Sequence, residues 1–197
     1  MNVAVLADHI RFVRMFLAEP RTVGAIAPSS SMLAREIVRQ AGVARSRTII
    51  ELGGGTGVFT RKIIEAAHPE AMILSIEINP TFAEILASRF SRVHVIADSA
   101  ERANDYLRAA GRISADCVVS GLPWAAFDSD LQTRLLTSIG KILADGGTFA
   151  TFAYLHASWL PAARSFRDRL YATFSSVQTT RVIWRNLPPA FVYRCRR

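Results

Sequence analysis

Cysteine, lysine and long apolar runs are what this sequence of 197 residues has little of. Its two cysteines, Cys117 and Cys195, lie in apolar, strand-like segments, so we expect buried thiols in a reducing compartment rather than a disulfide framework. No run of about 18 apolar residues is present, which is the length that a transmembrane helix requires. The N-terminus has no leading basic cluster, and we do not expect it to be a signal peptide. The sequence therefore predicts a cytoplasmic protein that does not span a membrane.

Arginine supplies nearly all of the basic charge. Lysine and arginine together number 24 against 16 acidic residues, which gives a formal net charge of +8, and Lys62 and Lys141 are the only lysines. The planar arginine head binds phosphate through two parallel hydrogen bonds. This composition is consistent with a phosphate-bearing partner, either nucleic acid or an anionic membrane surface. A high-GC genome and a need for solubility explain the same composition.

Strand-like and helix-like segments alternate from about residue 47 to residue 153, which is typical of a parallel sheet. The expected strands are 48–52, 72–76, 93–97, 116–119, 148–153, 175–184 and 190–195. The expected helices lie near 57–67, 80–90, 99–110, 129–143 and 159–171, and Gly146-Gly147 should separate the fourth of these from the next strand. The pattern predicts an α/β fold: a doubly wound, seven-stranded, mostly parallel sheet that ends in an antiparallel hairpin. Residues 1–46 should add N-terminal helices that form one compact unit with residues 47–197.

The first N-terminal helix carries an apolar stripe. Its members recur at helical spacing and are Leu6, Ile10, Val13 and Leu17. Arg11 and Arg14 lie off this stripe. Two interpretations remain open: the helix covers the core, or it lies among lipid headgroups with the arginines at the phosphates.

A glycine-rich turn is the strongest motif. Glu51-Leu-Gly-Gly-Gly-Thr-Gly57 follows an apolar strand and precedes a helix. A dinucleotide-binding fingerprint needs glycine at position 58, where this chain has Val58. The spacing E-x-G-x-G-x-G instead resembles the first motif of class I methyltransferases. Backbone N–H groups in such a turn can hold the carboxylate of the methionine part of S-adenosylmethionine (SAM).

Acidic residues end the next two expected strands. Glu77 and the following Ile78 stand where a carboxylate can accept both ribose hydroxyls, and Asp98-Ser99 stand where an acid and a hydroxyl can meet the adenine amino group. These acids in register with the glycine turn predict SAM as the cofactor. The expected cofactor-binding residues are Glu51, Gly53, Gly54, Gly55, Gly57, Glu77, Ile78, Asp98, Ser99 and Ser120. No metal site is expected.

The fourth strand leads into Ser120-Gly-Leu-Pro-Trp124, where the methyl acceptor should enter. Enzymes that methylate nucleic acid amines carry a side-chain acceptor two residues before the proline, to polarise an amine conjugated with a ring, whereas this chain has Gly121 there. An aliphatic amine, with a pKa of about 10.4 before perturbation, needs only to be desolvated and aligned. The pattern therefore favours an aliphatic amine.

Side chains near this turn are the candidates for the acceptor site. They are Ser120, Leu122, Trp124, Tyr154 and His156. His156 is interpreted as a proton acceptor or as a surface histidine. Trp124 either walls the acceptor pocket or packs in the core.

From about Phe12 to Arg194 the chain resembles the bacterial phospholipid N-methyltransferases. The resemblance is carried by Phe16-Leu-Ala-Glu-Pro with Gly24-Ala-Ile-Ala-Pro28-Ser29-Ser30, by Ser120-Gly-Leu-Pro123, and by Asn186-Leu-Pro-Pro-Ala-x-Val-Tyr193. The last motif is the most specific, since the similar rRNA adenine dimethylases lack it. The resemblance implies methylation of phosphatidylethanolamine toward phosphatidylcholine, on the inner face of a membrane whose anionic lipid the first helix binds.

The candidate lipid-binding residues are Arg11, Arg14, Ser29, Ser30, Asn186 and Tyr193. Ser29 and Ser30 are also typical helix caps, and Pro188-Pro189 is also typical of a plain turn. Two other functions remain open: an rRNA adenine N6-methyltransferase, and a SAM-binding module without turnover. Nothing in the pattern indicates an oligomeric state.

Overall fold

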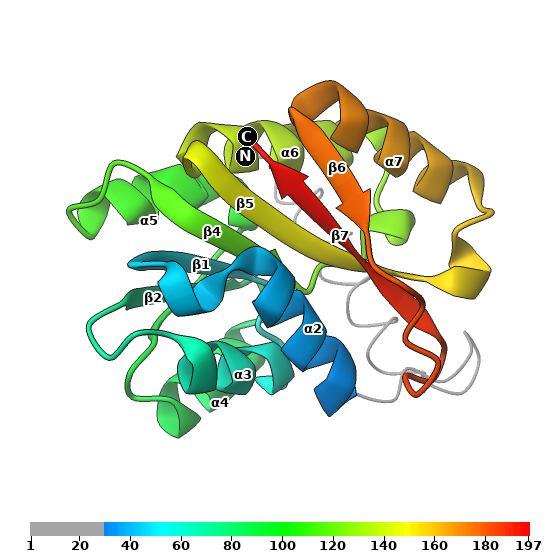
Figure 1. The fold of residues 1–197 in the computed structure, drawn as a ribbon. Coiled ribbons are helices and arrows are strands. Elements are labelled where there is room, and N and C mark those ends of the chain that lie inside the picture. Colours follow the sequence, from blue (N-terminus) through cyan, green and yellow to red (C-terminus); the bar gives the residue numbers. More distant parts are fainter. Residues whose placement is uncertain (1–29) are drawn as a thin grey trace.

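A seven-stranded sheet forms the centre of the structure, a computed structural model that describes residues 30–197 (Figure 1). The strands are β1 Thr48–Leu52, β2 Met72–Glu77, β3 His94–Ala97, β4 Ala115–Ser120, β5 Leu143–Tyr154, β6 Ser176–Thr179 and β7 Ala190–Arg196. Their order is β3-β2-β1-β4-β5-β7-β6. Strands β1 to β5 are parallel, and β7 runs antiparallel to both β5 and β6. The predicted fold class, a mostly parallel sheet that closes in an antiparallel hairpin, is confirmed.

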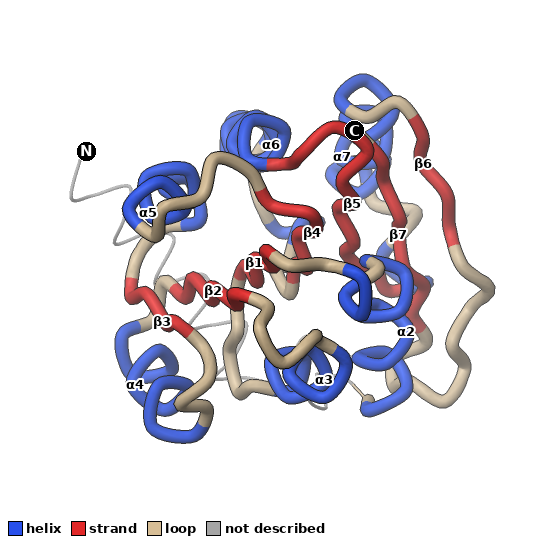
Figure 2. Tube along the Cα trace, turned by 60° about the vertical axis from the view of Figure 1, so that its left-hand side comes forward, coloured by secondary structure: helices blue, strands red, loops and turns tan. Residues whose placement is uncertain are grey.

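Helices cover both faces of the sheet (Figure 2). One face carries α2 Ser31–Ala41, α3 Val58–Ala66 and α4 Pro80–Arg89, and the other carries α5 Ala103–Ala109, α6 Ser129–Ile142 and α7 Pro161–Thr173. Strand β1 is buried along its whole length, with Ile49 in the core beneath α2 and α3 and Ile50 in the core beneath α6. A strand covered on both faces is mostly apolar along its length and does not alternate between apolar and polar residues, which is why β1 could be predicted from the sequence.

Three boundaries differ from the sequence prediction. Strand β5 begins at Leu143 and passes through Gly146-Gly147, which was predicted to break the chain. Gly146 takes φ 73°, and the pairing with β4 shifts register between Ala115 and Cys117, so the glycines make an irregularity within the strand instead of ending it. The predicted strand 175–184 stops at Thr179, and only an isolated bridge from Ile183 to Ala190 continues it. The predicted helix 99–110 begins as a separate 3-10 turn, Ala100–Arg102.

The first predicted helix lies outside the described residues, and the apolar stripe with Arg11 and Arg14 lies there with it. Among residues 30–197 there is no helix with the length and apolar content needed to cross a membrane.

The strand order indicates where on the sheet a ligand should bind. The chain leaves β1 outward to β2 and β3 and then returns to β4 on the other side of β1, so the order reverses between β1 and β4. In open α/β sheets, ligands bind outside the carboxyl ends of the strands at such a reversal. We call this side of the sheet, where β1 to β5 end, the carboxyl edge.

Candidate active site

The glycine turn after β1 has a backbone that only glycine adopts readily. Gly53, Gly55 and Gly57 have φ of 76°, 52° and 85°, in the left-handed region. A Cβ on Gly53 would lie 2.8 Å from a Leu122 methyl, and one on Gly57 would lie 2.5 Å from the Phe90 ring. At Gly55, by contrast, nothing lies within 4 Å of the Cβ position. The turn is thus packed on two sides and open at Gly55, directly before the N-terminus of α3.

Glu51 lies beneath this turn. Its carboxylate is fully buried and accepts hydrogen bonds from Thr60 Oγ1 at 2.8 Å and Ser75 Oγ at 2.7 Å. Burial raises its pKa to about 7. A Cβ on Gly54 would lie 3.3 Å from the same carboxylate and 2.7 Å from Ser75 Oγ. Glu51 therefore faces the underside of the turn and supports it from within the core.

Glu77 joins the end of β2 to the turn. Its Oε2 accepts a hydrogen bond from the Gly55 backbone N–H at 2.9 Å, and its Oε1 accepts one from the Asn79 N–H at 2.8 Å. The residue is 4% exposed, and burial raises its pKa. Ile78 follows in the same short connection to α4. A carboxylate has about four acceptor sites, and these two hydrogen bonds use two of them.

Asp98 ends β3 and is held from the side of α5. Its Oδ2 accepts hydrogen bonds from Arg102 at 2.7 Å and from the Tyr106 hydroxyl, and Oδ1 accepts from the Ser99 N–H at 2.6 Å. Burial opposes ionisation, but these hydrogen bonds and the Arg102 charge outweigh it and lower the pKa of Asp98. The Ser99 hydroxyl accepts from the Glu101 N–H at 3.3 Å. The structure thus brings Glu77 and Asp98, at the ends of β2 and β3, to the carboxyl edge, as expected from the sequence.

The turn after β4 packs directly on the glycine turn. A Cβ on Gly121 would lie 2.6 Å from the Gly53 carbonyl oxygen, so residue 121 has no room for a side chain. Ser120 Oγ fixes the turn by accepting hydrogen bonds from the Leu122 N–H at 3.3 Å and from Trp124 Nε1 at 3.1 Å. The close approach of the two turns therefore requires glycine at residue 121.

Trp124 packs in the core. It is 3% exposed, and its ring stacks on Phe166 of α7 with centroids 4.6 Å apart. Of the two interpretations made from the sequence, the structure therefore shows packing, because the indole is enclosed by α7 and the sheet.

A row of aromatic rings leads from the glycine turn to the end of β5. Phe59, in the first turn of α3, lies 5.7 Å from Phe152, which lies 5.3 Å from Tyr154, which stacks on His156 at 5.8 Å. The His156 ring is exposed, and burial raises the pKa of Tyr154. Sequence reasoning found Tyr154 and His156 but missed Phe59 and Phe152. The alternation of Phe152 and Tyr154 along one strand face was the available signal.

Comparison with known proteins adds the identity. Residues 29–106 match a family model described as ribosomal RNA adenine dimethylase. An ornithine lipid N-methyltransferase from Singulisphaera acidiphila is 32% identical over 194 residues, 97% of each chain. The chain belongs to that enzyme's family. It is a SAM-dependent methyltransferase.

Solved structures share the fold of the methyltransferase at low identity. The O-methyltransferase TomG from Streptomyces achromogenes, solved in complex with SAM, is 18% identical with a TM-score of 0.65, over 94% of this chain and 88% of its own. The N-methyltransferase NodS from Bradyrhizobium japonicum is 14% identical with a TM-score of 0.62, over 83% of this chain and 93% of its own. These likenesses confirm the class I methyltransferase fold.

The lipid-binding candidates of the methyltransferase take structural positions. Ser30 Oγ caps α2 by accepting from the Leu33 N–H at 3.2 Å, and the Ser30 N–H donates to Asn186 Oδ1 at 2.9 Å. Asn186 is 2% exposed and also donates to the Pro188 carbonyl. Tyr193 is 5% exposed and packs edge-on against Phe166. Both residues are thus buried, and Asn186 uses its amide to hold the hairpin to α2. Their contact with a lipid phosphate stays a prediction. Ser29, Arg11 and Arg14 lie outside the described residues.

Within residues 30–197 of the methyltransferase, no three His, Cys, Asp or Glu side chains form a group that could hold a metal ion.

Proposed function

We propose that this methyltransferase transfers the methyl group of SAM to the amine headgroup of a membrane phospholipid, taking phosphatidylethanolamine toward phosphatidylcholine. The observation that carries the proposal is the contact of Gly121 with the Gly53 carbonyl oxygen. It leaves no place at residue 121 for the side chain that polarises a ring-conjugated amine, while an aliphatic amine needs none. The relative that acts on ornithine lipid supports a lipid amine as the acceptor.

The cofactor residues follow from the carboxyl edge. The open side of Gly55 and the first N–H groups of α3 are suited to the carboxylate of the methionine part. We infer that Glu77 binds the ribose hydroxyls and that Asp98 with Ser99 binds adenine, which is supported by the position of these residues at the carboxyl edge. Glu51 acts from below, as a positioning residue that keeps Thr60 and Ser75 in place. SAM, when bound, supplies an electrophilic methyl group on a sulfonium centre.

The aromatic row is suited to an ammonium headgroup. An aromatic ring attracts the ammonium form of the headgroup, whereas the exclusion of water by Phe152 and Tyr154 favours its neutral form. The amine must lose its proton before it attacks. The acceptor nitrogen would take this methyl group, and the electron pair of the C–S bond would remain on sulfur. After the first and second methylations the nitrogen would lose a proton to water or to His156, whose ring is exposed beside Tyr154, whereas the third methylation gives a quaternary nitrogen that has no proton to lose.

The test offers competing acceptors to the full-length protein. Labelled SAM is incubated with vesicles of phosphatidylethanolamine, with vesicles containing ornithine lipid, and with ribosomal RNA, and each product is extracted. Label in phosphatidylethanolamine is the expected result. Label in ornithine lipid alone would retain a lipid amine and replace the headgroup, while label in no lipid would overturn the proposal.

An rRNA adenine N6-methyltransferase is the second candidate, favoured by the family model over residues 29–106. That match covers α2 and the cofactor half of the sheet but ends before the turn at Gly121. Label confined to RNA would establish it.

A further inference from the structure

Two loops at the carboxyl edge expose large apolar side chains. Trp159 and Leu160, just before α7, are 71% and 50% exposed, and Trp184 and Leu187, between β6 and β7, are 68% and 71% exposed. We refer to these four residues as the Trp-Leu loops. Large apolar side chains that cluster on a surface mark a binding face rather than chance exposure.

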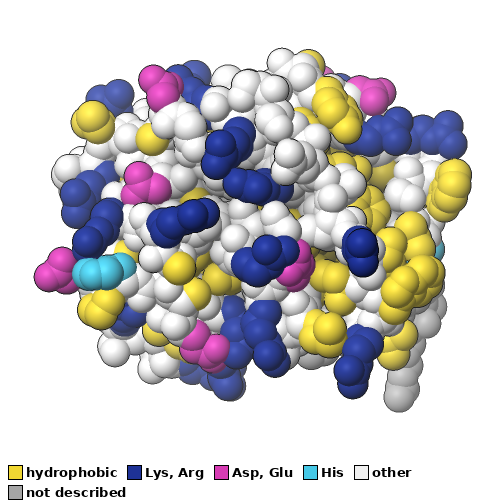
Figure 3. Space-filling model, viewed as in Figure 1, with side chains coloured by type: hydrophobic (Ala, Val, Ile, Leu, Met, Phe, Trp, Pro, Cys, Tyr) yellow, Lys and Arg dark blue, Asp and Glu magenta, His cyan; other side chains and the backbone are white. Residues whose placement is uncertain are grey.

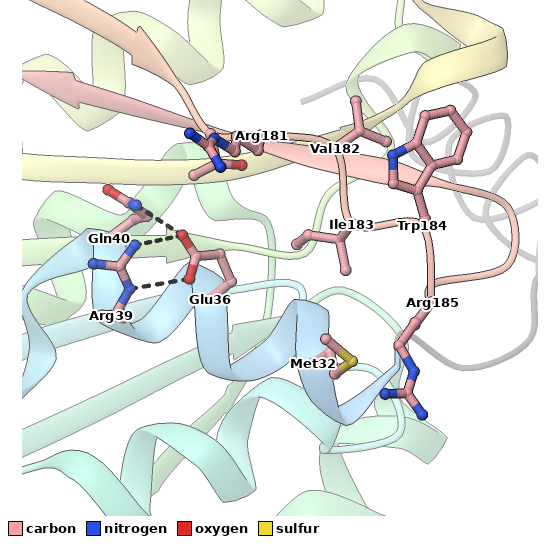
Figure 4. Close-up of a pocket in the computed structure, with 10 residues that line it drawn as sticks. Met32, Glu36, Arg39, Gln40, Arg181, Val182, Ile183, Trp184 and Arg185 are labelled. Atoms are coloured by element: carbon pink, nitrogen blue, oxygen red, sulfur yellow. Dashed lines mark hydrogen bonds and ion pairs between the residues drawn. The ribbon is translucent and has the colours of Figure 1, made fainter.

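The two loops extend from the same end of neighbouring strands. Tyr154 at the end of β5 pairs with Ala190 at the start of β7, and the Leu155 N–H donates to the Pro189 carbonyl at 2.8 Å. Both loops therefore lie at the carboxyl edge, on the right-hand side of Figure 1, as does the end of the aromatic row. Figure 4 shows the Trp184 ring pointing away from α2, although Trp184 is one of residues 180–185, which line a groove of about 530 Å³ together with α2.

Exposed arginines flank the Trp-Leu loops. Arg164 follows in the first turn of α7, and Arg181 and Arg185 belong to the segment that contains Trp184. Within the described part of the chain, none of the three forms an ion pair, whereas the acids on the adjoining helices do: Asp168 pairs with Arg167 and Glu36 with Arg39. In the space-filling view, hydrophobic side chains gather at the right-hand edge with basic side chains beside them (Figure 3).

We propose that the Trp-Leu loops dock the methyltransferase on an anionic lipid bilayer and so bring amine headgroups to the carboxyl edge. The proposal rests on the proposed function, and it adds the surface that makes contact. Indole rings prefer the headgroup level of a membrane, leucines enter the acyl boundary, and arginines bind lipid phosphates. A single-stranded RNA would use the indoles and the arginines but would leave Leu160 and Leu187 in water, so the bilayer fits the whole surface better.

Vesicle binding by the full-length protein tests the docking surface. The probes are vesicles of phosphatidylcholine with phosphatidylglycerol, and the variants are Trp159→Ser with Leu160→Ser, and Trp184→Ser with Leu187→Ser. Each pair should weaken partitioning by roughly tenfold or more, since two apolar side chains leave the lipid. Ile113→Ser is the matched control: Ile113 is 84% exposed but precedes β4, at the opposite edge of the sheet, so its partitioning should not change.

A second measurement separates docking from catalysis. Each variant is also assayed for SAM binding and for methylation of a short-chain phosphatidylethanolamine kept below its micelle concentration. Loss of vesicle binding with both of these activities kept supports the docking surface. Vesicle binding equal to that of the unmodified protein in both pairs overturns the docking surface and leaves the proposed function standing. Binding of each variant to single-stranded RNA is measured as well, and a larger loss of RNA binding than of vesicle binding also overturns the docking surface. An unmodified protein that binds vesicles but methylates no amine lipid would overturn the proposed function instead.

Discussion

At the scale of single residues, the contact between the two turns is the feature most open to test. The Cβ position of residue 121 lies 2.6 Å from the Gly53 carbonyl oxygen, and a backbone atom cannot move aside cheaply. Gly121→Asn would introduce the side chain that is typical of nucleic acid amine methyltransferases at this position, and we expect it to distort the glycine turn. The expected result is a loss of about 1–3 kcal/mol in the free energy of unfolding and a SAM affinity lower by roughly tenfold or more.

Urea unfolding and calorimetric SAM titration measure these effects. Gly140→Ala is the control, because nothing lies within 4 Å of its Cβ position in α6, and alanine should stabilise the helix by about 0.5–1 kcal/mol. Unchanged SAM affinity in Gly121→Asn would show that the two turns are not coupled.

Glu51 should give the stability a pH dependence of defined sign. Burial raises its pKa from the ordinary value of 4.5 to about 7, so between these values the folded protein binds a proton that the unfolded chain does not. The free energy of unfolding should therefore fall as pH rises through this window, by an amount on the order of 3 kcal/mol. Glu51→Gln should flatten the slope, leaving a smaller one from Glu77, whose pKa is also raised.

Urea unfolding at a series of pH values measures this slope, with exposed Glu84→Gln as the control. A slope that persists unchanged in Glu51→Gln would mean that Glu51 is ionised in the fold throughout the window.

At the scale of elements, Asn186 joins the hairpin of β6 and β7 to the start of α2. Its side chain accepts from the Ser30 N–H and donates to the Pro188 carbonyl. Asn186→Ala should lower the free energy of unfolding by about 1–2 kcal/mol, because a partly buried N–H and a partly buried carbonyl lose their partner. Urea unfolding measures this, and exposed Gln178→Ala on β6 should stay within about 0.5 kcal/mol. Equal stability of the two variants would mean that water replaces the amide.

The elements also show which features could be predicted from the sequence. Glu77 and Asp98 were placed correctly at the carboxyl edge because the ends of parallel strands meet there whatever the details of packing. The burial of Trp124 could not be predicted, because it depends on stacking with Phe166 of α7, which follows α6 and β5 in the chain. The contact of Asn186 with Ser30 was not predicted for the same reason: the two residues are 156 positions apart, and no local pattern encodes that contact.

At the scale of the whole molecule, cofactor binding should stabilise the fold through the strand-end acids. A ligand that binds only the folded state adds about 2.7 kcal/mol at a concentration of 100 times its dissociation constant. Saturating SAM should therefore raise the Tm of this 197-residue chain by several degrees. Glu77→Gln keeps an oxygen for the Gly55 N–H, but its NH2 group then faces the Asn79 N–H, and the charge and one acceptor proposed for the ribose hydroxyls are lost. We expect its Tm without SAM to be lower by a few degrees, because one backbone N–H loses its acceptor, and the SAM-induced shift to disappear at the same concentration. Differential scanning calorimetry with and without SAM measures both values. A full shift in Glu77→Gln would mean that the ribose is held by another residue, and that the acid at the end of β2 serves only to fix the glycine turn.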